Sequence, residues 1–293
     1  MSDPDIRPRP QPSRRAALGA LGALGTASLA ACGGASPAEE SSAASALDSE
    51  LESVLAATTA TCVVTATETA GPYPLVSVLD NSAIVRKNIT EGKTGTPLTL
   101  TLKFVDYDNG CTPLVGAAVY VWHCDANGEY SGYSSSANGS HSGETYLRGV
   151  QLTNSAGKVS FTTIFPGWYI PRLTHIHVQV FLASTTLSSS AVATATTQLC
   201  FPDAVTTAVY GNTTLYPKGQ NTVAATASAD QVFGNGVTTE TLSVSGSTTG
   251  GLAGGIVIGI SASVSSSESG DASGSSGGGG GGTPPSPPSG PMT

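Results

Sequence analysis

Two short segments contain the residue types that could carry out chemistry. In one of them, His175 and His177 lie two positions apart in the run His-Ile-His-Val-Gln-Val-Phe, whose alternation predicts a β-strand. Both imidazoles would project from one face of that strand, and Ile176 would face a core. Two imidazoles on one face could bind a metal ion, although a purely structural histidine pair has the same spacing.

The other side chains near this pair are not acidic. No Asp or Glu lies within ten positions of the pair, whereas Tyr169 lies six residues before His175, with Arg172 between them. His123 in a strand and His141 in a Ser/Gly loop are not expected to add a third imidazole. Neutral imidazoles with phenolates form a hard, electron-rich set. This set favours a trivalent ion such as ferric iron, whose charge would lower the tyrosine pKa.

The second segment spans residues 119–133 and contains two tyrosines, Tyr130 and Tyr133, in the run Gly-Glu-Tyr-Ser-Gly-Tyr. With several other motifs in the same order, it resembles the intradiol ring-cleavage dioxygenases, which cleave catechols and protocatechuate with non-haem ferric iron. The resemblance covers most of residues 61 to about 210. The other motifs are Glu68-Thr-Ala-Gly-Pro-Tyr73, Leu147-Arg-Gly-Val-Gln151, Pro166-Gly-Trp-Tyr169, Arg172-Leu-Thr-His-Ile-His177 and Thr197-Gln-Leu199.

This resemblance implies a non-haem Fe(III) cofactor held by two tyrosinates and two histidines. The implied ligands are Tyr130, Tyr169, His175 and His177. Tyr133 is the alternative to Tyr130, and its other role would be a pocket wall or a surface aromatic.

The resemblance also implies the residues that act on the substrate. Arg172 and Gln198 would stabilise the negative charge that develops during the reaction, and Tyr169 would leave the metal and accept a proton. Tyr73, Trp168 and Arg172 are expected to contact the substrate; a surface salt bridge is the alternative role for Arg172. The implied reaction is cleavage of a catechol by O₂ between its hydroxylated carbons, with a cis,cis-muconate-type product.

Two other functions stay open from the residues alone. One is a cell-surface β-sandwich that binds aromatics, sugars or a partner and has a vestigial metal site. The other is an unrelated copper or zinc site that uses the histidine pair. Only two residues separate Tyr169 from Arg172, and no N-terminal helical dimerisation region is visible, so the substrate and the oligomeric state stay open as well.

The composition favours an exported all-β protein. Only 11% of the 293 residues are charged, against about 25% in a typical soluble domain. The net charge of −8 argues against a nucleic-acid partner. Alternating segments predict a β-sandwich, immunoglobulin-like or prealbumin-like, with short helical pieces and long loops. The plainest predicted strands are residues 98–105, 117–122, 158–164 and 175–181.

The two ends of the chain have the composition of targeting and linker segments. Arg14 and Arg15 precede a short Ala/Leu/Gly run that ends in Leu-Ala-Ala-Cys32, which predicts a twin-arginine signal of the lipoprotein type with Cys32 lipidated. Cleavage would remove four arginines and two aspartates and change the net charge from −8 to −10. The protein is therefore expected at the cell envelope or surface, with the lipid anchor as its only membrane contact. The predicted divisions are 1–31 signal peptide, 32–60 tether, 61–263 catalytic domain and 264–293 disordered tail.

The remaining four cysteines agree with export, because an even number in an oxidising compartment predicts disulfides. We expect Cys111 to pair with Cys124, since both flank one short strand segment, and this leaves Cys62 with Cys200. The alternative is that these cysteines are free, buried thiols.

Overall fold

The structure is a computed structural model that describes residues 62–182, Ser188 and 191–261, together with Ser49, Glu52 and Leu55. The predicted signal peptide, Cys32 and the C-terminal tail lie outside the described residues. Within the described part of the chain, no helix is long and apolar enough to span a bilayer.

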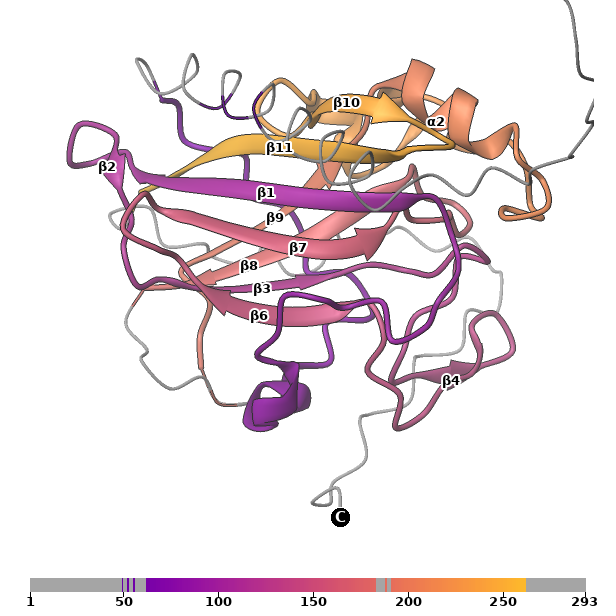
Figure 1. The fold of residues 1–293 in the computed structure, drawn as a ribbon, viewed down its shortest axis with the longest axis horizontal. Coiled ribbons are helices and arrows are strands. Elements are labelled where there is room, and N and C mark those ends of the chain that lie inside the picture. The colour runs from indigo at the N-terminus through magenta and orange to yellow at the C-terminus, as the bar shows by residue number, and fades with distance from the viewer. Residues whose placement is uncertain are drawn as a thin grey trace, which may run out of the picture.

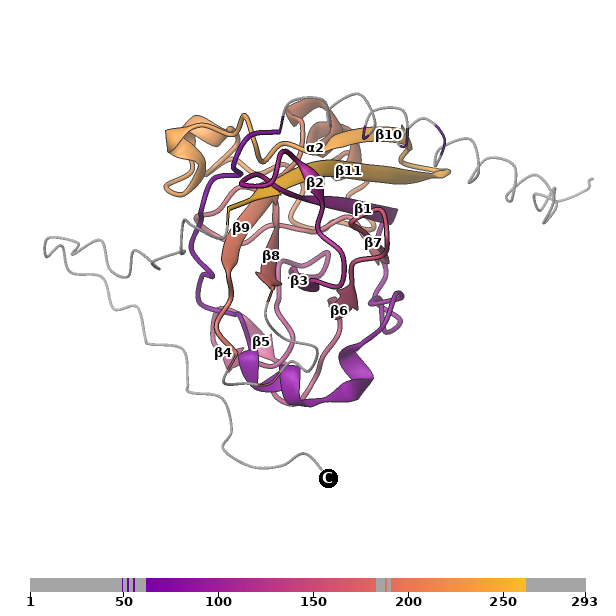
Figure 2. The ribbon, with the colours of Figure 1, turned by 90° about the vertical axis from the view of Figure 1, so that its left-hand side faces the viewer.

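Two β-sheets form the body of the domain (Figures 1 and 2). One has the order β10-β11-β1-β2, with β7 also paired to β1, and the other has the order β6-β3-β8-β9. A small hairpin of β4 and β5 lies apart from both sheets. The strands are β1 (Pro97–Asp106), β2 (Thr112–Pro113), β3 (Ala118–Trp122), β4 (Ser134–Ser135), β5 (Gly139–Ser140), β6 (Arg148–Leu152), β7 (Lys158–Ile164), β8 (His175–Phe181), β9 (Ala195–Cys200), β10 (Ser243–Ser247) and β11 (Gly251–Ile260). The helices are α2 (Asp203–Tyr210) and the 3₁₀ turns η2 (Val76–Asp80), η3 (Ser82–Ile84), η4 (Ala227–Ala229) and η5 (Phe233–Asn235).

The main core lies between these two sheets and follows the period-two pattern of the strands. Alternate residues of β1 (Leu98, Leu100, Leu102 and Phe104) pack against Ile176, Val178 and Val180 of β8. The four strands expected from the sequence are present as β1, β3, β7 and β8, and the predicted all-β sandwich is confirmed.

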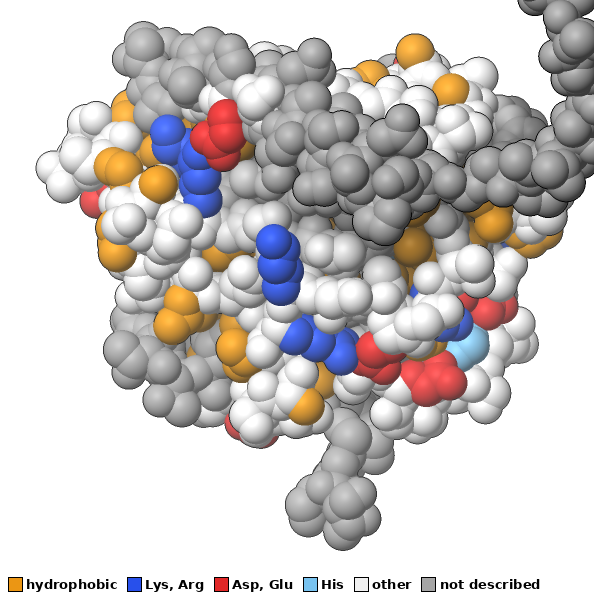
Figure 3. All heavy atoms as spheres, in the orientation of Figure 1, with side chains coloured by type: hydrophobic (Ala, Val, Ile, Leu, Met, Phe, Trp, Pro, Cys, Tyr) orange, Lys and Arg blue, Asp and Glu red, His pale blue; other side chains and the backbone are white. Residues whose placement is uncertain are grey.

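The first and last strands of the domain lie side by side. β1 pairs with β11 in parallel over nine residue pairs, from Leu98 opposite Leu252 to Asp106 opposite Ile260. The N-terminal segment joins the same edge through a parallel bridge between Val64 and Gly259. On the face in Figure 3, the described side chains are mostly uncharged.

The disulfide differs from both predicted pairs. Cys62 is bonded to Cys111 with their Cα atoms 5.8 Å apart, and Cys124 and Cys200 are free and buried. Cys62 and Cys111 are neighbours because both lie at the end of the first sheet where β1 and β11 finish. Cys124 follows β3 and Cys200 ends β9, so both belong to the second sheet. The predicted pairs Cys111–Cys124 and Cys62–Cys200 are therefore wrong, because Cys62 and Cys111 are bonded to each other.

The second sheet has another buried layer on its far side. Side chains of β3 alternate between the two layers, so that Tyr120 and Trp122 point away from the main core. Leu75, Val78 and Leu79 from the η2 region cover them. This outer layer, and not the main core, receives His175 and His177.

Two acidic side chains meet where the N-terminal segment crosses the C-terminal segment. Glu240 is 1% exposed, and its Oε1 has no hydrogen-bond partner. Burial, followed by the nearby Glu68 carboxyl, raises the pKa of Glu240 to about 8. Between pH 4.5 and about 8, the Glu240 carboxyl is therefore protonated in the folded protein and ionised in the unfolded chain.

This difference predicts a pH-dependent stability. Between pH 4.5 and about 8 the folded state holds the extra proton, so the free energy of unfolding should fall with rising pH, by up to about 1.4 kcal/mol per unit. Glu240→Gln, which cannot ionise, should flatten this slope in chemical denaturation measured at several pH values. Glu144→Gln changes an exposed carboxyl and serves as the control. An unchanged slope in Glu240→Gln would contradict the prediction.

Candidate active site

The two histidines of β8 lie on the outer face of the second sheet, as the alternation predicted. Both are buried, at 2% and 1% exposure. His177 lies between Trp122 on β3 and Gln198 on β9 in the strand register. The Trp122 ring stacks on the His177 imidazole with centroids 4.7 Å apart and planes 1° from parallel. The sheet therefore fixes the orientation of this imidazole.

Three side-chain atoms converge at this position. The Nε2 atoms of His175 and His177 are 3.0 Å apart. The Tyr130 phenol oxygen lies 3.3 Å from the first and 3.4 Å from the second. Tyr130 is fully buried, so bulk solvent does not reach its phenol.

Hydrogen bonding fixes the tautomer of one of the two rings. His175 Nδ1 donates to the Leu173 carbonyl at 2.5 Å, so its Nε2 carries a lone pair. Burial, followed by the charge of Arg172, lowers the pKa of His175 to about 3. Burial and the neighbouring His175 lower the pKa of His177 well below its usual value. Both rings are thus neutral at physiological pH. When the His177 proton lies on its unpartnered Nδ1, the two Nε2 lone pairs face one another and a shared cation would satisfy both.

Tyr130 reaches the histidines from the loop between β3 and β4. Asn138 braces this loop: its side-chain oxygen accepts from the Tyr130 amide at 2.7 Å and its Nδ2 donates to the Tyr130 carbonyl at 2.8 Å. Burial raises the pKa of the Tyr130 phenol well above its usual value. A nearby cation is therefore needed to ionise this phenol.

Tyr133, the alternative to Tyr130, has a different role. Its hydroxyl accepts the Leu75 backbone N–H at 2.8 Å, and the Arg148 guanidinium lies 5.8 Å from its ring. Tyr133 thus supports the segment before η2, and Tyr130 is the phenol that faces the imidazoles.

Tyr169 completes the ring cluster from the loop before β8. Its ring makes edge contacts with Tyr130 at 5.5 Å and with His175 at 5.7 Å between centroids. Burial raises the pKa of Tyr169 to about 12, although the charge of Arg172 opposes the rise.

This set of donors fits the implied ferric ion. In the described part of the chain, no three His, Cys, Asp or Glu side chains gather as ligands. Two neutral imidazoles and two phenols are therefore the groups available here, and a trivalent ion supplies the charge needed to ionise buried phenols. Tyr130, Tyr169, His175 and His177 would hold it.

Arg172 and Gln198 lie together beside this cluster. Arg172 is 3% exposed, so its alternative role as a surface salt bridge does not hold. Its Nη2 donates to Gln198 Oε1 at 2.7 Å, and Gln198 Nε2 donates to the Thr69 carbonyl at 2.7 Å. The motif that contains Thr69 is thus tied to the strand that carries Gln198.

The two predicted substrate-contacting aromatics lie in different places. Tyr73 stacks on Tyr130 with ring centroids 4.6 Å apart and is part of the cluster. The Trp168 indole packs into the main core and donates to the Gly219 carbonyl at 2.9 Å. The structure does not bring the Trp168 ring among the ligand rings, and its contact with substrate stays a prediction.

The loops that carry Tyr130 and Tyr169 pack backbone to backbone at two glycines. A Cβ on Gly128 would lie 2.1 Å from the Trp168 carbonyl oxygen, and one on Gly167 would lie 2.6 Å from those of Asp125 and Ala126. The absence of side chains at these glycines lets the two tyrosines reach one centre.

Gly128→Ala should therefore destabilise the domain by about 2 kcal/mol and push the loops apart, because backbone atoms cannot move aside as a side chain can. The matched control is Gly143→Ala, since Gly143 has a similar positive φ but no neighbour within 4 Å of its Cβ. Thermal unfolding checks the difference, and equal losses in the two variants would assign the effect to φ alone.

Some supporting residues were missed because their partners are distant in sequence. Arg148 is fully buried; its Nε donates to Ser131 Oγ at 2.8 Å and its Nη1 to the Tyr73 carbonyl at 2.9 Å. Arg148 lies in the Leu147–Gln151 motif, but the sequence of that motif does not show which groups the arginine side chain contacts. The other two histidines are used elsewhere, as expected: His123 bonds to Thr163 Oγ1 and His141 pairs with Glu129 and Glu144.

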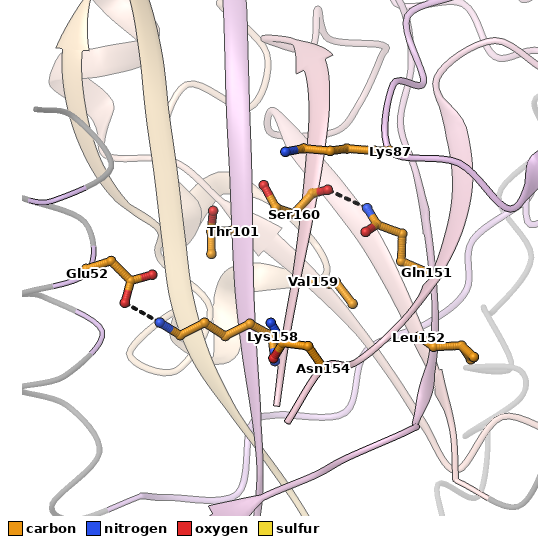
Figure 4. A pocket seen from close by; sticks show the side chains of 9 residues that line it. All are labelled: Glu52, Lys87, Thr101, Gln151, Leu152, Asn154, Lys158, Val159 and Ser160. Carbon is orange, nitrogen blue, oxygen red and sulfur yellow. Dashed lines mark hydrogen bonds and ion pairs between the residues drawn. The ribbon is translucent and has the colours of Figure 1, made fainter. Parts of the chain in front are cut away.

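A separate polar hollow of about 380 Å³ opens at the edge of β1, β6 and β7 (Figure 4). In it, Lys158 pairs with Glu52, and Gln151 donates to the Ser160 carbonyl. None of the predicted site residues lines this hollow.

The comparisons with known proteins agree with the fold. The dioxygenase family model matches residues 71–209. An intradiol ring-cleavage dioxygenase from Tetranychus urticae is 26% identical, with a TM-score of 0.58, and covers 70% of this chain and 98% of its own. A second dioxygenase crystal structure is also 26% identical, with a TM-score of 0.59, over 71% of this chain and 98% of its own. None of the curated proteins matches the chain.

Fold and cluster together define a dioxygenase built on a β-sandwich. The family-model match over residues 71–209 and the shared fold make the chain similar to the intradiol ring-cleavage dioxygenases.

Proposed function

We propose that this dioxygenase uses non-haem ferric iron to cleave a catechol with O₂ between its two hydroxylated carbons, with a cis,cis-muconate-type product. The observation that carries the proposal is the convergence of Tyr130 Oη and the two histidine Nε2 atoms within 3.4 Å in a buried site. Ferric iron, when bound, ionises its phenol ligands and withdraws electron density from a chelated catechol, so that the ring becomes reactive toward O₂.

The chain's own residues have separate roles in this scheme. Tyr130 and the two histidines are held by sheet and loop contacts and would serve as fixed ligands. Tyr169 has a high pKa, so its phenolate oxygen can accept a proton from the substrate hydroxyl. Arg172, already hydrogen-bonded to Gln198, offers guanidinium N–H groups to negative charge on the substrate.

The direct test is iron analysis together with O₂ uptake on a panel of catechol, protocatechuate and hydroxyquinol. The purified protein should be coloured by tyrosinate-to-iron charge transfer and should consume O₂ with at least one of these substrates. A colourless protein that stays inactive after ferric loading would contradict the proposal.

We also propose that the enzyme is exported and anchored by a lipid on Cys32. The Arg14-Arg15 pair and the Leu-Ala-Ala-Cys box support this location. Mass spectrometry of the mature N-terminus should find a lipid-modified Cys32. An unmodified cysteine, or a mature chain that begins at another residue, would rule out the anchor.

A further inference from the structure

A segment beyond the family-matched residues reaches the active site. The match ends at residue 209, whereas the chain continues through η4 and η5 before entering β10. Phe233 of η5 is fully buried and lies 6.4 Å from the His175 ring between centroids. Its ring also lies 5.7 Å from the Arg172 guanidinium carbon. The residues between η4 and η5 are therefore placed to act on Arg172.

Asp230 makes the closest contact from this segment. The Arg172 Nε donates to both of its carboxylate oxygens, at 3.2 and 2.9 Å. Both side chains are buried, at 3% exposure for the arginine and 2% for the aspartate. A buried, hydrogen-bonded ion pair of this kind holds a guanidinium in one orientation far better than an exposed pair does.

The carboxylate is itself held rigidly. It accepts backbone N–H groups from Leu173 at 2.6 Å, Val232 at 2.8 Å and Phe233 at 3.1 Å. Burial alone would raise the pKa of Asp230, but the hydrogen bonds from Arg172 and the Leu173 backbone outweigh it, so the pKa lies below its usual value. Asp230 is thus an ionised, immobile acceptor.

These contacts use only part of the guanidinium. Nε is bound to Asp230 and Nη2 to Gln198 Oε1. A guanidinium has five N–H donors in a rigid plane, so fixing Nε on one side fixes where the remaining donors point. Asp230 therefore sets the direction from which Arg172 addresses Tyr169 and the substrate.

We propose that Asp230 is a positioning residue of the active site, which orients the Arg172 guanidinium and makes the 227–235 segment part of the catalytic unit. This inference rests on the proposed ring cleavage. Asp230 does not touch the reacting atoms and acts only through Arg172.

The first test is a double-mutant cycle in the iron-loaded enzyme. Asp230→Asn should lower kcat by about 100-fold, the cost of a misplaced catalytic group, and change KM less. In an Arg172→Gln background the same change should lower kcat no further. The charge-transfer colour should persist, because the ligands are untouched. An Asp230→Asn enzyme that folds and keeps its kcat, or one whose loss is equal in both backgrounds, would overturn the proposal.

The controls separate positioning from folding. Glu240→Gln removes another buried carboxyl of the C-terminal segment and should leave kcat unchanged. If Asp230→Asn does not fold, Asp230→Glu keeps the charge but moves the carboxylate by one methylene. It should show the same kcat loss and the same lack of effect in the Arg172→Gln background; wild-type kcat in a folded Asp230→Glu enzyme would count against positioning.

A second measurement is independent of the reaction. In the metal-free protein, the Arg172 Nε–H resonance in a nitrogen–proton correlation spectrum should be protected from solvent exchange, and Asp230→Asn should remove that protection. If Arg172 Nε–H exchanges in the wild type as fast as an exposed arginine, Asp230 does not hold it. If protection is present but no catechol is cleaved, the proposed function fails while the positioning contact stands.

Discussion

Replacing Tyr130 by phenylalanine is expected to abolish both iron binding and ring cleavage. The change removes the phenol oxygen that lies 3.3 and 3.4 Å from the two imidazole Nε2 atoms but keeps the ring that stacks on Tyr73. Iron affinity should fall by more than about 100-fold, because even residues that only support a ligand contribute that much. Iron content, charge-transfer absorbance and O₂ uptake measure the three losses.

Tyr133→Phe is the matched control for this prediction. It removes a buried phenol only three positions away, whose hydroxyl accepts the Leu75 N–H and does not face the imidazoles. It should lower stability by about 1 kcal/mol, typical of one lost hydrogen bond, and keep iron and activity. If Tyr133→Phe loses iron and Tyr130→Phe retains it, the assignment of the ligand is reversed.

Arg172→Gln is expected to lower kcat by about 10²- to 10³-fold, the usual effect of removing one donor to developing charge. Arg172 lies beside the ligand cluster, so iron content and colour should stay near those of the unmodified enzyme. Because the charge grows along the reaction path, kcat should fall more than substrate binding weakens. Steady-state O₂ uptake over a range of substrate concentrations separates the two parameters.

Lys218→Gln provides the comparison for Arg172→Gln. Lys218 is an exposed cation 5.6 Å from the Trp168 ring centroid, so its loss changes the local charge equally without touching the cluster. Its kcat should be unchanged. An equal loss in both variants would mean that the overall positive charge matters, and not the position of the guanidinium.

The strands and the histidine pair were predictable because they follow from local alternation. In β8, every second side chain enters the main core, so His175 and His177 had to share the other face. The order of the motifs supplied Tyr130, Tyr169, Arg172 and Gln198 as a set, and the structure brings these side chains into one layer.

The errors and omissions concern contacts between distant segments. Cys62 and Cys111 meet because the N-terminal segment runs beside β11, a neighbour that no local pattern reveals. Asp230 is 58 residues from Arg172, and Arg148 is 75 residues from Tyr73, so their pairing depends on the completed fold. Asp230 lies in an irregular segment, and no local sequence pattern indicates that it pairs with Arg172.

The parallel pairing of β1 with β11 has a consequence for the order of assembly. During synthesis, β1 has to wait for about 150 further residues before its parallel neighbour exists, which is a costly long-range closure. The first sheet therefore cannot be completed until the ribosome has passed residue 260. A nascent chain arrested before β11 would expose an unpaired edge of β1, an aggregation hazard that favours chaperone protection until synthesis ends.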